Sequence, residues 1–424
     1  MPMLNVDIDS ILRPFQRFGV HLGLERIQQL LANLGNPHHK VPIIHVAGTN
    51  GKGSVCAYLS SILTEAGYRV GRYTSPHLVN WTERICLNEQ PVSPEQLKQL
   101  LLQVQNAILD DAESPTQFEV ITAAAWLYFA QSEVDIAVVE VGLGGRLDAT
   151  NVCDRPLVTI ITSISREHWQ QLGPTLADIA REKAGILKPG CPAVVGQLQP
   201  SALSVVRSRI IELGCPSVWP QPARELPTAG TRKALYEEIE YSLPLLGEIQ
   251  LTNSALALAA VQILQQQGWE ISPQAIISGM AKTKWPGRMQ WKTWRNYQLL
   301  IDGAHNPAAA LALRSFVDTL DSKSVTWVMG MLSTKDHADI FKALLRQNDE
   351  LYLAPVPDHS SANPTELATL AQNICPLAAC RTYLDLITAL EAAVSSKKLI
   401  VLCGSLYLVG HFLENLENAS IESV

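Results

Sequence analysis

Residues 47–54, reading Ala-Gly-Thr-Asn-Gly-Lys-Gly-Ser, have the composition of a phosphate-binding loop. They follow an apolar run at 42–47, which predicts a buried strand, and precede a segment at 53–66 that predicts a helix. Glycines let backbone N–H groups turn toward phosphate oxygens, and the helix adds its positive dipole end. Lys52 would neutralise the β- and γ-phosphates, and the Ser54 hydroxyl would bind Mg²⁺. The predicted nucleotide contacts are Gly48, Thr49, Asn50, Gly51, Lys52, Gly53 and Ser54.

The spacing of this loop departs from the standard Gly-x-x-x-x-Gly-Lys-Ser/Thr pattern. Gly48 lies too close to Gly51, and Gly53 stands between the lysine and the hydroxyl. A tight glycine turn that begins a helix therefore stays open as an alternative. We favour the phosphate loop because the strand, the glycines, the lysine and the hydroxyl follow one another in the order that such a loop requires.

A carboxylate that could hold the metal ends another apolar run, at 135–140. Ligand sites of parallel sheets lie at the carboxyl ends of the strands, which is where Glu140 falls. The alternative is a strand-end acid that bonds a neighbouring loop. No Asn-Lys-x-Asp motif for reading guanine occurs, so a GTPase is disfavoured.

The elements that must position these residues alternate between strand and helix along the 424-residue chain, which predicts an α/β fold with parallel sheets. The alternation breaks at 285–294, where Pro286, Gly287 and three tryptophans occur, and then restarts. We therefore expect two domains, residues 1–286 and 287–424.

Composition excludes several function classes. A net charge of −7 argues against a nucleic-acid partner, which usually requires a basic face. No uninterrupted apolar run reaches the roughly 18 residues of a membrane span, and the first ten residues lack the basic start of a signal peptide. The eight cysteines are scattered without a Cys-x-x-Cys pair, so we expect reduced thiols and a cytoplasmic location.

Several motifs together resemble the folylpolyglutamate synthase/dihydrofolate synthase family, a branch of the Mur ligase superfamily. The resemblance covers nearly the whole chain, and its motifs lie at 48–54, 73–78, 118–122, 140–151, 181–186, 285–289 and 302–307. It implies a Mur-ligase-like P-loop ATPase domain with a parallel-rich sheet, followed by a smaller Rossmann-like α/β domain that binds glutamate. It also implies ATP-driven amide formation: ATP phosphorylates a carboxylate of dihydropteroate or of a reduced folate, and the amine of L-glutamate attacks the acyl phosphate.

The resemblance also implies a metal site. Its ligands are the positions matching Ser54, Ser75, Glu140 and His168, a mixed set that Mg²⁺ accepts when water completes the octahedron. Ser75 could instead cap a turn, and His168 could be structural. The family commonly has Leu-Asp-His-Thr around this histidine, whereas 166–169 reads Arg-Glu-His-Trp here, which puts this ligand in doubt.

Further catalytic and ATP-contacting positions follow from the same resemblance. Lys183 matches a lysine that is carbamylated in the family; the alternative is an ordinary lysine in the last turn of a helix. Asn253 matches an ATP contact but could be a helix N-cap. Arg288 and Asp302 match phosphate and ribose contacts but could pair across the two domains. The catalytic candidates are Lys52, Lys183 and His305, and His305 would help to place glutamate or the nucleotide.

For the folate end, the resemblance points to Thr116, Gln117, Phe118, Glu119, Leu147, Asp148 and Ala149. Phe118 would stack on the flat pterin, although a buried phenylalanine at the start of an apolar helix needs no ligand to explain it. Two other functions stay open: a Mur-type ligase acting on another carboxylate, and a nucleotide-binding regulator without catalysis. We expect a monomer whose partners are ATP, L-glutamate and dihydropteroate, a reduced folate, or both.

Overall fold

A computed structural model describes residues 7–16, 22–109, 113–228, 230–320, 324–377 and 379–421. The chain forms two compact units. The first comprises Met1–His77, Trp81–Pro244 and Gln250–Thr283, and the second comprises Leu78–Asn80, Leu245–Ile249 and Lys284–Val424. Both are α/β structures with mainly parallel sheets, which confirms the predicted fold class.

The first unit is built on an eight-stranded sheet with the order β4-β3-β2-β5-β1-β6-β7-β8. Its strands are β1 (Ile43–Ala47), β2 (Val70–Tyr73), β3 (Ile85–Leu87), β4 (Gln90–Pro91), β5 (Ile136–Glu140), β6 (Val158–Ile161), β7 (Ala193–Val195) and β8 (Ser217–Val218). The six strands from β2 to β8 run parallel, and β3 and β4 add antiparallel partners at one edge. A three-stranded antiparallel sheet follows, formed by β9 (Arg224–Leu226), β10 (Lys233–Tyr236) and β11 (Ile239–Ser242).

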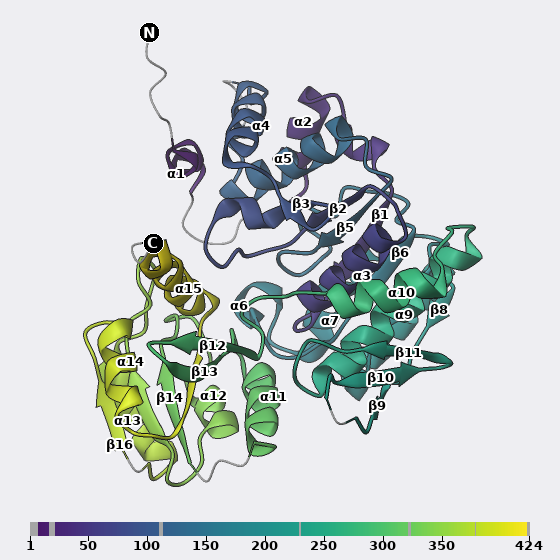
Figure 1. Cartoon of the computed structure of the whole chain (residues 1–424). Coiled ribbons are helices and arrows are strands. Elements are labelled where there is room, and N and C mark those ends of the chain that lie inside the picture. The colour runs from purple at the N-terminus through teal and green to yellow at the C-terminus, as the bar shows by residue number, and fades with distance from the viewer. Residues whose placement is uncertain are drawn as a thin grey trace. The chain divides into compact units, whose positions relative to one another are not determined.

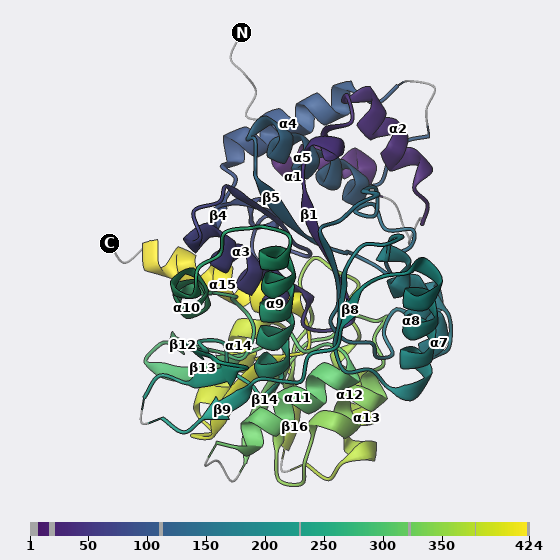
Figure 2. The ribbon, with the colours of Figure 1, turned by 90° about the vertical axis from the view of Figure 1, so that its right-hand side faces the viewer.

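The helices of this unit are α1 (Ile8–Leu12), α2 (Glu25–Asn33), α3 (Lys52–Glu65), α4 (Pro94–Asn106), α5 (Gln117–Gln131), α6 (Trp169–Leu172), α7 (Leu176–Lys183), α8 (Pro200–Leu213), α9 (Ile249–Gln266) and α10 (Pro273–Lys282). Short 3₁₀ turns are η1 (Arg13–Phe15), η2 (Pro37–Lys40), η3 (Trp81–Arg84) and η4 (Ala184–Ile186). Helices α2, α4 and α5 gather together in both views, and α10 lies beside α3 (Figures 1 and 2).

The two faces of the large sheet differ in what covers them. Tyr73 and Val139 share one core with α1, α2, α4 and α5. Arg72 and Glu140, which are their neighbours in sequence, reach side chains of α3 instead. Because side chains alternate along a strand, α3 covers the opposite face. That face is where the glycine-rich loop ends and α3 begins.

The second unit has a six-stranded sheet with the order β12-β13-β17-β14-β15-β16. Its strands are β12 (Gln290–Trp294), β13 (Tyr297–Ile301), β14 (Val325–Met329), β15 (Glu350–Leu353), β16 (Ala379–Thr382) and β17 (Leu399–Cys403). Among these described strands, β12 pairs antiparallel with β13, and the other neighbouring strands pair parallel. Its helices are α11 (Pro307–Asp318), α12 (His337–Leu344), α13 (Pro364–Ile374), α14 (Leu386–Val394) and α15 (Leu406–Ile421). Two separate cores, one with α11, α12 and α13 and one with α14 and α15, show that helices cover both faces.

Within the described residues, no helix is long and apolar enough to cross a membrane.

Candidate active site

The glycine-rich loop adopts a conformation that only glycine permits at two positions. Gly48 has φ 153° and Gly51 has φ 88°. A Cβ atom at Gly48 would overlap the Thr162 hydroxyl, and one at Gly51 would overlap the side-chain oxygen of Asn253. The loop is therefore shaped by close backbone approach to its neighbours as well as by its positive φ angles.

Hydrogen bonds to the end of β6 hold the loop in place. The backbone N–H groups of Thr49 and Asn50 donate to Ser163, at 2.7 Å to its carbonyl oxygen and 3.0 Å to its hydroxyl. The Thr162 hydroxyl donates to the Asn50 carbonyl oxygen at 2.6 Å. These two N–H groups thus bond protein atoms. The N–H groups in the first turn of α3 have no partner within the helix, and such groups at a helix N-terminus can bind an anion.

Lys52, Glu140 and Ser75 lie together beside this loop. The Lys52 Nζ is 3.8 Å from Glu140 Oε1 and donates to the Thr49 carbonyl oxygen at 3.2 Å. The Ser75 backbone N–H donates to Glu140 Oε2 at 3.2 Å. The Lys52 and Glu140 side chains are only 17% and 6% exposed, so their charges are poorly screened by water. An ammonium and a carboxylate so close to a phosphate loop can balance the charge of a polyphosphate and its metal ion.

The donor atoms of this region suit Mg²⁺. Ser54 and Glu140 are buried, and Ser75 is half-buried. In the described part of the chain, no group of three or more His, Cys, Asp or Glu side chains could hold a metal ion. The set here consists of hydroxyl and carboxylate oxygens, hard ligands that Mg²⁺ accepts together with several waters.

His168 lies between β6 and α6, and its backbone is in the left-handed region. It precedes α6 with φ 50°, and its Nε2 is 3.9 Å from Glu167 Oε1. Its side chain is 44% exposed. Arg166 stacks on the ring of Trp169, so the residues that depart from the family pattern contact each other.

Lys183 ends α7 and reaches the phosphate loop. Its Nζ donates to the Gly48 carbonyl oxygen at 2.7 Å. Burial lowers the pKa of this lysine to about 7, and the nearby charge of Lys52 adds to the effect, while Glu167 and Asp148 act against it. A large fraction of the amine is therefore uncharged at neutral pH.

The loop after Glu140 is tied to β1 by buried polar side chains. Asp148 accepts hydrogen bonds from the Leu143 N–H at 2.8 Å and from the Thr150 hydroxyl at 2.5 Å. Because Thr150 donates to Asp148, its oxygen accepts from His45 Nε2, which is 2.9 Å away. Burial lowers the pKa of His45 to about 3 and raises that of Asp148. Leu147 is half-buried beside this network, and Ala149 is buried.

The same loop packs against the end of α7. The Arg146 N–H donates to the Glu182 carbonyl oxygen at 2.8 Å, and Asn151 Nδ2 donates to the Gly185 carbonyl oxygen at 3.1 Å. Glu140 and Lys183 therefore sit on segments that are bonded to each other.

Structural roles account for much of the predicted folate-binding set at the start of α5. Thr116 and Glu119 form a reciprocal capping box, and both Glu119 oxygens accept from Arg26 Nε at 3.1 Å. Phe118 packs so closely on Gly142 that a Cβ there would overlap its ring. Gln117 and Phe118 are half-buried.

Asn253 lies inside α9, four residues after the helix begins at Ile249, so the alternative that it caps the helix is wrong. Gln250, three residues before Asn253, belongs to no motif of the sequence, and its side chain bonds both Asn253 and Ser54. Ser54 lies 196 residues from Gln250 along the chain, so no local sequence pattern could have identified Gln250 as its partner.

In the second unit, Asp302 follows β13 and its carboxylate accepts from the N–H groups of Met289 at 2.8 Å and Ala304 at 2.7 Å. Burial raises its pKa, whereas the nearby charge of Arg288 acts in the opposite direction. His305 Nδ1 lies 2.7 Å from the Gly303 carbonyl oxygen. Asp302 and His305 lie in the segment that follows β13, and Arg288 precedes β12, whose first residue Gln290 pairs with Ile301 at the same end of the hairpin.

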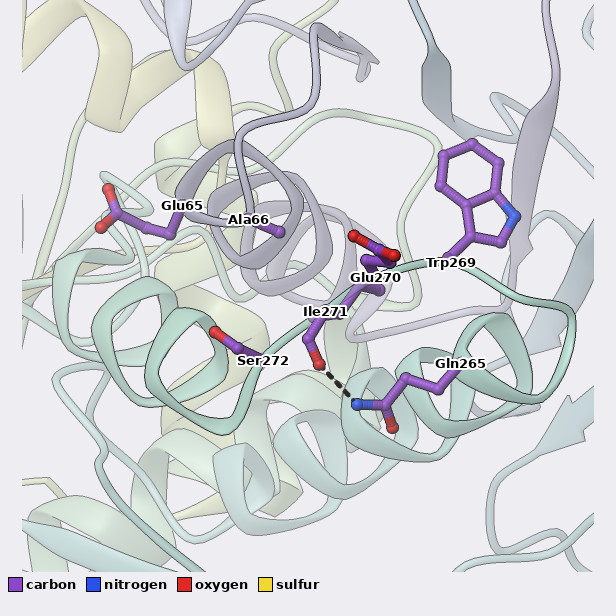
Figure 3. A pocket seen from close by; sticks show the side chains of 7 residues that line it. All are labelled: Glu65, Ala66, Gln265, Trp269, Glu270, Ile271 and Ser272. Atoms are coloured by element: carbon purple, nitrogen blue, oxygen red, sulfur yellow. Dashed lines mark hydrogen bonds between the residues drawn. The ribbon is translucent and has the colours of Figure 1, made fainter.

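A hollow of about 580 Å³ at the other end of α3 is not part of this arrangement. Its lining residues are Glu65, Ala66, Gln265, Trp269, Glu270, Ile271 and Ser272 (Figure 3). A 14-residue helix is about 20 Å long, so the hollow is about that far from the phosphate loop.

Family models and individual relatives indicate the same protein family for this chain. Residues 46–261 match the Mur ligase middle domain, and residues 288–415 match the C-terminal domain of dihydrofolate synthetase. The chain is 36% identical to the dihydrofolate synthase/folylpolyglutamate synthase of Bacillus subtilis over 95% of its length and 96% of that protein. It is 35% identical to the Escherichia coli protein of the same name, covering 94% of this chain and 92% of the relative.

Solved structures agree with these sequence matches. The folylpolyglutamate synthase of Mycobacterium tuberculosis, complexed with ADP, superposes with a TM-score of 0.87 at 31% identity and covers 96% of this chain and 97% of its own. Escherichia coli FolC in complex with DHPP and ADP has a TM-score of 0.84 at 33% identity, and each chain is covered to 97%.

Proposed function

Because the chain belongs to the dihydrofolate synthase/folylpolyglutamate synthase family, it is an ATP-dependent ligase of folate metabolism, and we propose that it adds L-glutamate to dihydropteroate, to the γ-carboxyl of reduced folates, or to both. In this proposal an acceptor carboxylate oxygen attacks the γ-phosphorus of ATP, forming an acyl phosphate and releasing ADP. The amine of glutamate then attacks the acyl carbon, loses a proton, and expels inorganic phosphate as the amide forms.

The observation that carries this proposal is the position of Lys52 and Glu140 beside the phosphate loop. A carboxylate that approaches a polyphosphate is repelled, so positive charge must cancel the charge of the transferring group. Lys52, bent over the loop by its bond to the Thr49 carbonyl oxygen, would supply that charge from the protein side. The first turn of α3 would bind the phosphate oxygens.

Mg²⁺ would be held by Ser54, Ser75, Glu140 and His168. The bond between the Ser75 backbone N–H and Glu140 supports Ser75 and Glu140, and the place of Ser54 in the first turn of α3, two residues after Lys52, supports Ser54. The resemblance of the sequence supports His168. The ion supplies charge neutralisation and orientation of the phosphates when bound.

Carbamylation of Lys183 belongs to the same proposal. Addition of CO₂ requires an uncharged amine, and a pKa lowered to about 7 by burial supplies one. The Nζ already lies 2.7 Å from the loop carbonyl of Gly48, so a carboxylate added there would face the phosphate loop.

The remaining contacts are proposals carried by the resemblance. The folate end would bind at Thr116, Gln117, Phe118, Glu119, Leu147, Asp148 and Ala149. Asn253, Arg288 and Asp302 would contact ATP, and His305 would place glutamate or nucleotide. Residues 1–286 would then be the ATP- and folate-binding domain, and 287–424 the glutamate-binding domain. We propose a cytoplasmic monomer, which the scattered free cysteines support for the location.

ADP release by the purified protein tests the proposal. We expect release only when ATP, Mg²⁺, L-glutamate and a pteroate or folate acceptor are all present. A comparison of dihydropteroate with tetrahydrofolate as acceptor would assign the step. ADP release with an unrelated carboxylate, or nucleotide binding without any release, would contradict the proposal and favour one of the two alternative functions.

A further inference from the structure

Four polar side chains form a buried cluster between α3 and α9. Ser54 and Tyr58 lie four residues apart on α3, and Gln250 and Asn253 lie three residues apart on α9. Each pair therefore occupies one face of its helix. All four residues are at most 4% exposed.

Gln250 is the centre of this cluster because it bonds each of the other three. Its Nε2 donates to the Ser54 hydroxyl oxygen at 3.4 Å. Its Oε1 accepts from Asn253 Nδ2 at 3.1 Å and from the Tyr58 hydroxyl at 3.4 Å. A buried glutamine amide with its oxygen and nitrogen engaged has one preferred orientation, since rotating it would leave buried groups unpaired.

Two of these partners face the phosphate loop. Ser54 belongs to the loop itself. Asn253 Oδ1 occupies the space that a side chain at Gly51 would need, so it lies against the loop backbone. The Gln250 amide thus fixes the direction of a hydroxyl and of an amide that adjoin the loop, while Tyr58 anchors it from within α3.

We infer that Gln250 is a positioning residue, which holds the Ser54 hydroxyl with an oxygen lone pair free for the metal ion and holds Asn253 against the loop. A hydroxyl oxygen has two lone pairs, and donation from Gln250 to one of them leaves the other for a ligand. The inference rests on the proposed function, because it takes Ser54 as a ligand of the magnesium that accompanies ATP.

The test is calorimetry of ATP binding, with MgCl₂ and with EDTA, in the absence of acceptor. The quantity of interest is the magnesium gain, the ratio of the dissociation constant in EDTA to that in magnesium. Gln250→Met keeps the length of the side chain and removes its hydrogen bonds. We expect the magnesium gain of this variant to fall roughly three- to tenfold, the range that corresponds to one net hydrogen bond.

The matched control is Tyr241→Phe. Tyr241 bonds Ser254 of α9 at 2.7 Å, so this variant loses a buried hydrogen bond to the same helix at a place away from Ser54. We expect it to lower thermal stability and to keep the magnesium gain of the wild type. If Gln250→Met does not fold, Tyr58→Phe removes only the anchor and should reduce the gain in the same direction by a smaller factor.

The possible outcomes distinguish a failure of the role of Gln250 from a failure of the proposed metal site. A wild type with a magnesium gain and a Gln250→Met variant with the same gain would overturn the role of Gln250 and leave the proposed function intact. Equal losses in Gln250→Met and Tyr241→Phe would also overturn it, because the effect would then be general loosening of α9. A wild type without any magnesium gain would contradict the proposed metal site itself, and the inference would fall with it.

Discussion

Removing the ammonium of Lys52 should abolish turnover while leaving the fold intact. In the structure this charge lies 3.8 Å from a carboxylate oxygen, with the lysine side chain only 17% exposed. A pair of unit charges at about 4 Å interacts by roughly 4 kcal/mol at the effective dielectric constant near a protein surface. If the ammonium lies as close to the transferring phosphoryl group as it does to Glu140, loss of the ammonium should lower the rate about a thousandfold.

The assay is steady-state ADP release by Lys52→Ala with saturating ATP, glutamate and acceptor. Lys282→Ala is the matched control, since Lys282 also pairs with a glutamate, Glu65, but is 64% exposed and lies at the other end of α3. Thermal melting of both variants should show folded protein. Activity of Lys52→Ala within tenfold of the wild type would refute the charge argument.

Three further predictions follow from the same geometry. Glu140→Ala should raise the magnesium concentration needed for half-maximal activity, and an unchanged magnesium titration would leave Glu140 a structural residue. The pKa of Lys183 is lowered to about 7 in the folded protein, so the unfolded chain binds more protons between about pH 7 and 10. The free energy of unfolding should therefore rise with pH in this window, by up to roughly 1.4 kcal/mol per pH unit from this group, and urea titrations should show a smaller slope for Lys183→Met; equal slopes would contradict the shift. Gly51→Ala should weaken ATP binding more than tenfold, because its Cβ would overlap Asn253, whereas Gly67→Ala, with a similar φ of 90° and open space around it, should bind ATP as the wild type does.

Features encoded locally were predictable from the sequence. The strand, glycines and lysine around Lys52 are contiguous, and Glu140 ends an apolar run, so the pattern alone indicated both. The alternation of strands and helices likewise indicated an α/β fold with parallel sheets, and the fold confirms this. For Lys52 and Glu140 the signal lies within one short stretch of sequence, and the alternation is a sum of such local signals.

Long-range contacts were not predictable in this way. Ser163 bonds the loop from 113 residues away, and Gln250 reaches Ser54 across 196. The sequence left open that Asn253 caps a helix, but α9 begins at Ile249, which places Asn253 inside it. The antiparallel sheet β9–β11 was also missed, because its short strands of charged and apolar residues carry little periodicity.

The central claim, that a carboxylate is activated by phosphoryl transfer before glutamate attacks, has a direct isotopic test. If the acceptor carries ¹⁸O in its reacting carboxyl group, one labelled oxygen should appear in the inorganic phosphate after a single turnover, because the amine displaces phosphate from the acyl carbon. Phosphate released without label, while labelled amide product accumulates, would contradict the account.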